Sequence, residues 1–431
     1  MIEDSPKTQV SQDVLTVLTD EQYAPILKKI NDEYLYWDKV KYQIPAGLKA
    51  EDFWTAVRYS RRLGAEKIEF ASRTFFFKMT SHMQEMLHSF DTLSSMTTLS
   101  GTEGDRERGY YLLSSIMEEA IASSQMEGAS TTRKVAKEML LKQIKPRDKS
   151  QQMILNNYNT IRYLMEHKDD TLTPELLLEI QRQITHRTLD DSLDEGRFRT
   201  DNNIFVVNGM TGETAHEPPS HTVISEAVSR ICSFTENDEP FIHPVIKAII
   251  IHFMISYLHP FVDGNGRTAR SIFYWYMLKK GYRMTQYLSI SRIIYRSTGR
   301  YEKAFLYTEH DNLDLGYFIQ YNLKVLLQAF EELRQYIERN QKQENAFLTQ
   351  GIPGLNERQM KILKICSDKP SSVFTSKDLE TLFGVSVKTV RSDLEGLADA
   401  GLMERVALNR RLTGYTRSSN YEERVKELRK R

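Results

Sequence analysis

Cysteine is nearly absent from this chain, since only two of its 431 residues are cysteine. Cys232 and Cys366 lie far apart in the sequence, which excludes a disulfide framework and a cysteine-based zinc site. So few thiols fit a reducing compartment. The chain is long enough for two or three domains of roughly 100–200 residues each, and tens of core residues can be buried.

A net charge is missing as well, because 58 lysines and arginines balance 58 aspartates and glutamates. Without a global field, any nucleic-acid or membrane partner must bind a local patch. Long apolar runs are also missing: the longest, near Ile249, is too short to span a bilayer and contains His252. The N-terminus lacks the basic start and apolar core of a secretion signal. These absences predict a cytoplasmic protein with no membrane contact.

One stretch concentrates chemically useful residues, namely residues 259–270, HPFVDGNGRTAR. The apolar segment before it, residues 243–258, predicts a helix that Pro260 prevents from continuing. The segment after it, residues 267–281, predicts a second helix that ends at a glycine. The stretch is therefore expected to form a tight loop between two helices.

This loop has the features of an anion site. Gly264 and Gly266 allow positive φ angles, so successive backbone N–H groups can converge ahead of the second helix. Arg267 and Arg270 share one face of its first turn, where positive charge opposes the helix dipole unless an anion is bound. Asp263 offers a hard oxygen ligand for a magnesium ion that bridges phosphates. The residues predict a site for the phosphates of a nucleotide.

His259 adds a ring that can take a proton at neutral pH, so a base stands beside the phosphate site. The whole pattern resembles the signature HxFx(D/E)GNGRxxR of the Fic (fido) domain family. All fixed positions of that signature are present: His259, Phe261, Asp263, Gly264, Asn265, Gly266, Arg267 and Arg270. A match of this length is far more specific than a single glycine motif.

The resemblance implies a protein adenylyltransferase, which moves AMP from ATP to a Ser, Thr or Tyr hydroxyl of a target protein. It implies that His259 and Asn265 are catalytic and that Asp263 binds Mg²⁺. It assigns the nucleotide to Gly264, Asn265, Gly266, Arg267 and Arg270. ATP and a protein substrate are the implied partners, and the enzyme itself is a second target.

A second motif precedes the loop. Residues 109–128 predict a helix that ends at Gly128, and Glu127 lies at the negative end of its dipole, where it needs a cation. Residues 123–128, SSQMEG, resemble the family's inhibitory motif (S/T)xxxE(G/N). The resemblance implies that Ser123 and Glu127 are the inhibitory residues and that Glu127 pairs with Arg270. The alternative is an exposed glutamate at an ordinary helix end.

A short β-rich run follows at residues 203–210, with an Asn208-Gly209 turn. In the family such a flap aligns the target hydroxyl, and residues 196–199, GRFR, resemble the motif that precedes it. The target-docking residues implied are Ile204, Phe205, Val206 and Val207. An ordinary surface hairpin is the alternative. His216 and His221 flank a Pro-Pro pair and are expected to shape a turn instead of binding metal.

The remaining sequence suggests four parts. Residues 1–110 are predicted to be a helical extension, because residues 52–113 show apolar residues at helical spacing. Residues 111–340 form the predicted Fic domain. Residues 341–354 are polar with glycines and a proline, and predict a linker.

Residues 355–431 predict a winged helix-turn-helix domain with a charged tail. Two helical segments around a turn precede a basic hairpin at residues 405–415. The residues expected to contact DNA are Lys388, Thr389, Arg391, Arg410 and Arg411. Winged helices also dock proteins, so a DNA partner and a protein partner both stay open.

Taken together, the sequence predicts an all-α fold, with a Fic-type helical bundle, a β-hairpin flap and a C-terminal winged helix. Two other functions stay open beside adenylyl transfer. One is removal of AMP, or transfer of another phosphate-bearing group. The other is a DNA-binding regulator that only senses nucleotide. Self-association as a homodimer is also open.

Overall fold

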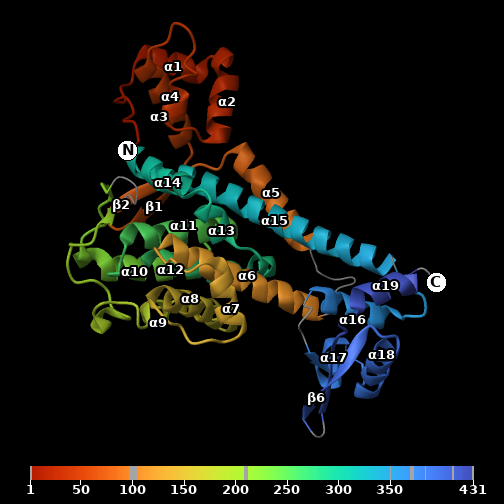
Figure 1. Cartoon of the computed structure of the whole chain (residues 1–431). Helices are drawn as coiled ribbons and strands as arrows, with labels where there is room; N and C mark the ends of the chain where they lie inside the picture. The colour runs from red at the N-terminus through yellow and green to blue at the C-terminus, as the bar shows by residue number, and fades with distance from the viewer. Residues whose placement is uncertain are drawn as a thin grey trace. The chain divides into compact units, whose positions relative to one another are not determined.

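The computed structural model describes residues 2–96, 105–207, 212–349, 351–368, 373–383, 385–409 and 412–429 (Figure 1). These residues are mostly helical, as the sequence predicts, and strands form only small antiparallel sheets. The chain divides into two compact units, Met1–Glu331 and Glu332–Arg431.

Unit 1 begins with a cluster of short helices: α1 (Gln12–Thr19), η1 (Glu21–Tyr23), α2 (Ala24–Glu33), α3 (Trp37–Val40) and α4 (Ala50–Arg62). Arg61 joins this cluster to the rest of the unit. Its buried guanidinium donates to the Tyr317 hydroxyl over 2.6 Å, and Tyr34 donates to the Asp314 carboxylate over 2.8 Å. A buried charge held by several partners is costly to separate. The N-terminal helices are therefore part of unit 1.

A β-hairpin lies within residues 52–113, where the sequence predicts helix throughout. It consists of β1 (Glu66–Phe70) and β2 (Arg73–Phe77). Ala71 and Ser72 between them have φ angles of 48° and 59°, the left-handed pair that a two-residue hairpin turn requires. Alternate residues point into the core along both strands, which is the spacing of a strand. The helical prediction is wrong here because the apolar run around Phe75 fits either period over so short a length.

The remaining elements of unit 1 follow, and the last helix among them continues past the end of the unit at Glu331. Its helices are α5 (Ser81–Met96), α6 (Asp105–Met126), α7 (Arg133–Leu141), α8 (Lys149–Glu166), α9 (Pro174–Thr185), α10 (Ile224–Glu236), α11 (Pro244–Leu258), α12 (Asn265–Lys279), α13 (Ile290–Tyr295), α14 (Thr298–His310) and α15 (Gly316–Thr349). Short 3-10 helices are η2 (Ser192–Asp194), η3 (His221–Val223) and η4 (Arg283–Tyr287). The strands β3 (Val206–Val207) and β4 (Thr214–His216) pair antiparallel.

Helices α11 and α12 form the middle of unit 1, with α6 and α8 on one side and α14 and α15 on the other (Figure 1). Nearly every side chain of α11 is buried, which explains why its sequence is apolar all round. Within the described part of the chain, no helix is long and apolar enough to cross a bilayer. The apolar run near Ile249 is therefore a core helix.

The predicted linker at residues 341–354 needs correction. Helix α15 continues to Thr349, and the boundary between the two units, at Glu331 and Glu332, falls inside this helix. Gln, Lys, Glu and Ala dominate the first part of the predicted linker and are good helix formers, so their polarity does not indicate a coil. The chain leaves the helix before Pro353 and Gly354, and Gly354 has a φ of 87°.

Unit 2 has the winged-helix order. Its elements are α16 (Glu357–Asp368), β5 (Val373–Thr375), α17 (Ser376–Phe383), α18 (Val387–Asp399), β6 (Met403–Asn409), β7 (Leu412–Arg417) and α19 (Tyr421–Arg429). The strand order is β5-β7-β6. Leu363, Leu394 and Leu402 are fully buried in a core of their own. This arrangement confirms the predicted helix-turn-helix domain.

Candidate functional site

His259 lies where α11 ends. Its φ of 48° is left-handed, and Pro260 follows directly, so the helix cannot continue. The Nδ1 atom of His259 lies 3.2 Å from the Ser256 carbonyl oxygen, which can only accept a hydrogen bond. Nδ1 therefore carries the proton, and the Nε2 lone pair is left to act as a base. Burial lowers the pKa of His259 to about 4, so the ring is neutral at pH 7.

The loop after His259 is held by its own side chains. Asn265 accepts a hydrogen bond from the Phe261 N–H and donates one to the Phe261 carbonyl, both over 2.9 Å. Gly264 has a φ of 86°, and a Cβ there would lie 2.8 Å from Thr185, so glycine is required. The family resemblance implies a catalytic role for Asn265. In the structure, its carboxamide binds the Phe261 backbone and so stabilises the loop.

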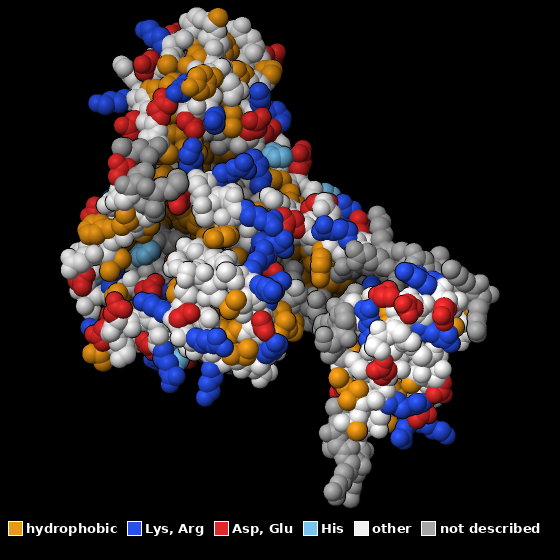
Figure 2. Space-filling view, in the orientation of Figure 1, with side chains coloured by type: hydrophobic (Ala, Val, Ile, Leu, Met, Phe, Trp, Pro, Cys, Tyr) orange, Lys and Arg blue, Asp and Glu red, His pale blue; other side chains and the backbone are white. Residues whose placement is uncertain are grey.

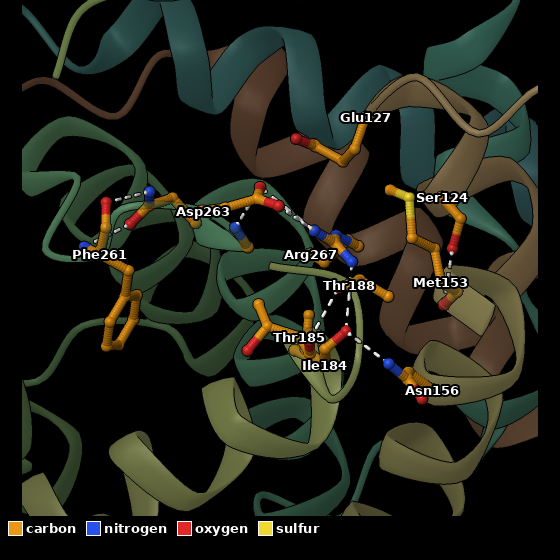
Figure 3. Close-up of polar contacts among 12 residues, drawn as sticks. Ser124, Glu127, Met153, Asn156, Ile184, Thr185, Thr188, Phe261, Asp263 and Arg267 are labelled. Atoms are coloured by element: carbon orange, nitrogen blue, oxygen red, sulfur yellow. Dashed lines mark hydrogen bonds and ion pairs between the residues drawn. The ribbon is translucent and has the colours of Figure 1, made fainter. Parts of the chain in front are cut away.

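Arg267 and Asp263 face each other within this loop (Figure 3). The buried Arg267 guanidinium donates to both Asp263 carboxylate oxygens and to the Ile184 carbonyl, each over 3.2 Å. Among the described residues, the Arg267 Nε–H has no hydrogen-bond partner. A buried donor without a partner is costly, so an anion that reached it would be bound favourably.

Asp263 is also the predicted magnesium ligand, and its side chain is 41% exposed. The described residues contain no group of three or more His, Cys, Asp or Glu side chains that could hold a metal ion. A single exposed carboxylate fits Mg²⁺, which keeps several waters and takes further oxygen ligands from substrate phosphates. The residues present are therefore compatible with a metal that arrives with the nucleotide.

Glu127 lies beside the N-terminus of α12, as the inhibitory motif implies. Its carboxylate accepts a hydrogen bond from the Arg270 guanidinium over 2.9 Å. Arg270 also donates to the hydroxyl and the carbonyl of Ser123, over 2.9 and 3.0 Å. A Cβ on Gly266 would lie 2.2 Å from Glu127 Oε1, so this carboxylate sits directly against the loop backbone. Figure 3 shows Glu127 near the Asp263–Arg267 pair.

Glu127 lies where the surrounding groups stabilise a negative charge. Its carboxylate lies at the first turn of α12, where the helix dipole and Arg270 favour a negative charge. The sequence predicts a conflict between the arginines at this helix start and the helix dipole, and in the structure the Glu127 carboxylate, directly after α6, resolves it. A phosphate group bound at the same turn would compete with it.

Glu119 fixes α6, the helix that Glu127 directly follows, and no motif in the sequence indicates this role. This buried carboxylate of α6 accepts hydrogen bonds from the Tyr274 hydroxyl over 2.9 Å, and from the Ser289 hydroxyl and the Ser291 N–H over 3.0 Å each. Burial raises the pKa of Glu119, although these bonds oppose the effect. Because the partners lie on α12 and around α13, helix α6 is tied to the core on two sides.

Arg199 is the last residue of the GRFR motif, and it contacts the loop that follows His259 directly. Its backbone N–H donates to the Pro260 carbonyl over 2.9 Å, and its Nε–H donates to the His259 carbonyl over 2.8 Å. Its other donors bind the Asp201 and Pro219 carbonyls. Arg199 therefore joins the segment before β3 to the loop that holds His259.

The predicted flap begins with a short strand. Among the described residues of the predicted run, Val206 and Val207 form this strand, and Ile204 and Phe205 precede it. Phe205 and Val207 are 49% and 53% exposed, while Ile204 and Val206 are partly buried, so alternate side chains face solvent. The predicted turn at Asn208-Gly209 lies outside the described residues.

In unit 2, Ser386 caps the N-terminus of α18, where its hydroxyl accepts a hydrogen bond from the Thr389 N–H. Lys388 and Arg391 are exposed on this helix, and Arg391 lies 3.4 Å from Glu395. Arg410 and Arg411 lie outside the described residues.

Comparison with known proteins finds a family match in each of the two units. Residues 171–277 match the Fic/DOC family, and residues 358–407 match the DeoR-like helix-turn-helix domain. A protein adenylyltransferase Fic of Culex quinquefasciatus is 32% identical over 117 residues, which is 27% of this chain and 21% of the relative. One of Nematostella vectensis is 28% identical over 116 residues, 27% of this chain and 25% of the relative. The chain thus matches about a fifth to a quarter of the length of these curated relatives.

Solved structures show the same fold. A Fic family protein from Desulfovibrio desulfuricans aligns with a TM-score of 0.55 at 16% identity, over 80% of this chain and 98% of that one. A Fic-1 fragment from C. elegans aligns with a TM-score of 0.52 at 15% identity, over 78% of this chain and 90% of that one. The chain therefore carries a Fic/DOC domain and a C-terminal DeoR-like helix-turn-helix domain.

Proposed function

We propose that this chain, which carries a Fic/DOC domain, is a protein adenylyltransferase that moves AMP from ATP to a Ser, Thr or Tyr hydroxyl and is restrained by Glu127. The observation that carries the proposal is the geometry of one loop. A neutral His259 with its Nε2 lone pair available stands beside the N-terminus of α12, where an anion is favoured. The curated relatives are named as protein adenylyltransferases, which supports the same assignment.

In this proposal His259 takes the proton of the target hydroxyl through Nε2. The hydroxyl oxygen then attacks the α-phosphorus of ATP, the bond to the β-phosphate oxygen breaks, and pyrophosphate leaves. Arg267 and Arg270 hold the outer phosphates, and the Gly264–Gly266 backbone faces the charge that develops on phosphate oxygens. Asp263 would hold Mg²⁺, which neutralises phosphate charge when bound.

Glu127 restrains the reaction because it occupies the guanidinium that the outer phosphates need. Arg270 is 2% exposed, so its donors reach only groups that enter the site. One guanidinium cannot serve the Glu127 carboxylate and a phosphate in full at the same time. ATP can bind with Glu127 in place, but its phosphates are then held away from the reactive pose.

The test is label transfer from ATP into a cell lysate, with ATP labelled at the α-phosphate or at the γ-phosphate. Adenylyl transfer predicts that only α-label becomes covalently bound to protein, and that Glu127→Gly increases it. Covalent γ-label would show phosphoryl transfer and contradict the proposal. Loss of label from protein that was adenylylated beforehand would instead support the removal of AMP.

Unit 2 suggests a DNA partner, because residues 358–407 match a DeoR-like helix-turn-helix domain. Lys388 and Arg391 are exposed on α18, the second helix of the motif, which is the helix that enters the major groove in such domains. Figure 2 shows both signs of charge on the visible face of unit 2, so affinity for DNA would depend on a local basic surface.

A further inference from the structure

His216 ends strand β4, and its ring lies between two oxygen atoms of other elements. Its Nδ1 atom lies 2.8 Å from the Glu309 carboxylate of α14, and its Nε2 atom lies 2.8 Å from the Tyr257 carbonyl of α11. The side chain is only 9% exposed. The ring therefore joins β4 to two helices, instead of shaping the turn that the sequence predicts for it.

Both partner atoms only accept hydrogen bonds. A ring that satisfies both must donate from both nitrogens, and only the imidazolium ion can do so. In either neutral tautomer, one nitrogen lone pair would face an oxygen and repel it. Burial lowers the pKa of His216, but the bond to Glu309, the charge of Glu309 and the Tyr257 carbonyl outweigh burial, so the pKa is raised.

The charged and titratable groups that face His216 come from each element around it. Glu309 belongs to α14, Tyr257 to α11, and Glu217 follows His216 in the chain. His259 also lies within electrostatic range, because the charge of His216 helps to lower the pKa of His259. Two carboxylates therefore favour the imidazolium, and its charge adds to the effect of burial, which is the main reason that the pKa of His259 is lowered.

The position of His216 connects the flap with the base. In the β3–β4 pair, His216 lies opposite Val206, which belongs to the predicted target-docking segment. Its acceptor Tyr257 stands two residues before His259 on the same helix end. His216 therefore links the docking strand to the helix end that carries the base, beside the contacts that Arg199 makes from the segment before β3.

We propose that His216, as an imidazolium, is the positioning residue that fixes the β3–β4 pair against α11, so that a target hydroxyl is presented to His259 less well once His216 loses its proton. The inference rests on the proposed adenylyl transfer and adds a dependence on pH to the docking of the protein target. It concerns the target and leaves the binding of ATP unchanged.

Glu309→Gln is the variant that separates this role from simple packing. A glutamine has nearly the same shape, but its NH₂ group can donate to Nδ1 of a neutral ring. Nε2 then keeps its proton and still donates to the Tyr257 carbonyl. The variant should therefore hold β4 in place without a charge on His216. His216→Gln should fail to hold β4 in place at low pH and at high pH alike.

The experiment uses the full chain in a Glu127→Gly background. It measures kcat/KM across pH, at saturating ATP and magnesium, for a purified lysate protein that the α-label experiment shows to be modified. We expect kcat/KM to fall about tenfold as His216 deprotonates. This factor corresponds to the free energy of one charge-assisted hydrogen bond. KM for ATP should not change, and the Glu309→Gln profile should lack this fall. Identical profiles for the parent and Glu309→Gln would overturn the proposal.

A second measurement does not need enzyme activity. NMR of selectively labelled histidines should show that the pKa of His216 is above the ordinary histidine value in the parent and lower in Glu309→Gln. In the parent, hydrogen exchange of the β4 amides should become faster as His216 deprotonates. In Glu309→Gln, it should not. A neutral His216 at pH 7 would overturn the inference. If no variant transfers AMP, the proposed function fails, and these two readouts still decide the role of His216.

Discussion

Replacing Glu127 with glycine removes the carboxylate that occupies Arg270. The hydrogen bond is 2.9 Å long, with Arg270 2% and Glu127 27% exposed. A charge-assisted hydrogen bond in such a setting is worth roughly 1.5–3 kcal/mol. If the pair must open before the phosphates reach their reactive pose, its loss should raise adenylyl transfer by about tenfold to a hundredfold.

The assay is the single-turnover rate of α-label transfer to protein, at saturating ATP and magnesium. Glu127→Gln keeps the shape and removes the charge, so its rate should fall between those of the parent and Glu127→Gly. Glu118→Gln is the matched control, because Glu118 lies on α6, the helix that Glu127 directly follows, but pairs with Arg133 and Lys137. An unchanged rate in Glu127→Gly, or an equal gain in Glu118→Gln, would refute autoinhibition through this contact.

Four further outcomes are expected. His259→Ala should abolish transfer but leave ATP affinity within about threefold, since the phosphate ligands remain; calorimetry and label transfer check this. Asp263→Ala should weaken magnesium-dependent ATP binding by about tenfold or more, and an unchanged magnesium titration would count against that ligand. Gly266→Ala should destabilise the parent more than it destabilises Glu127→Gly, because its Cβ would lie 2.2 Å from Glu127 Oε1; additive free energies of unfolding would contradict the contact. Binding of the full chain to pooled genomic DNA should weaken as salt rises, and removing the charge of Lys388 should lower the salt slope by about 1; no retardation at low salt would favour a protein partner.

The active loop could be predicted because its information is local. Residues 259–270 contain the helix stop, the glycines and the arginines in one run, and the structure places them as that run implies. The pair of Glu127 and Arg270 spans 143 positions, and it was predicted only because two motifs of one family occur together. The geometry of that pair agrees with the prediction, while its inhibitory role stays a prediction.

The spacing of residues in the sequence does not predict the side-chain contacts that support the loop. Glu119 and Ser291 are 172 positions apart, and His216 and Glu309 are 93 apart. Such pairs form only when helices dock, and a lone glutamate or histidine does not indicate its partner. Arg199 belonged to a recognised motif, but nothing in that motif showed that it binds the His259 carbonyl.

The two corrections to the fold have local causes. Around Phe75 the apolar residues fit both a strand and a helix, and the hairpin turn at Ala71 and Ser72 contains none of the glycine or asparagine that usually marks such a turn. In α15, the polarity of the residues after position 340 predicts a linker, but these residue types favour helix. In both segments, amino-acid composition predicts the secondary structure less well than conformational propensity and tertiary packing do.

The central claim is that His259 promotes covalent transfer of AMP to a protein hydroxyl. Mass spectrometry tests it most directly, after Glu127→Gly is incubated with ATP, magnesium and a lysate. The account predicts an adduct of one adenylyl group on Ser, Thr or Tyr, of the chain itself or of a lysate protein, which disappears when His259→Ala is added to Glu127→Gly. Nucleotide binding without any adduct, or an adduct that persists without His259, would contradict it.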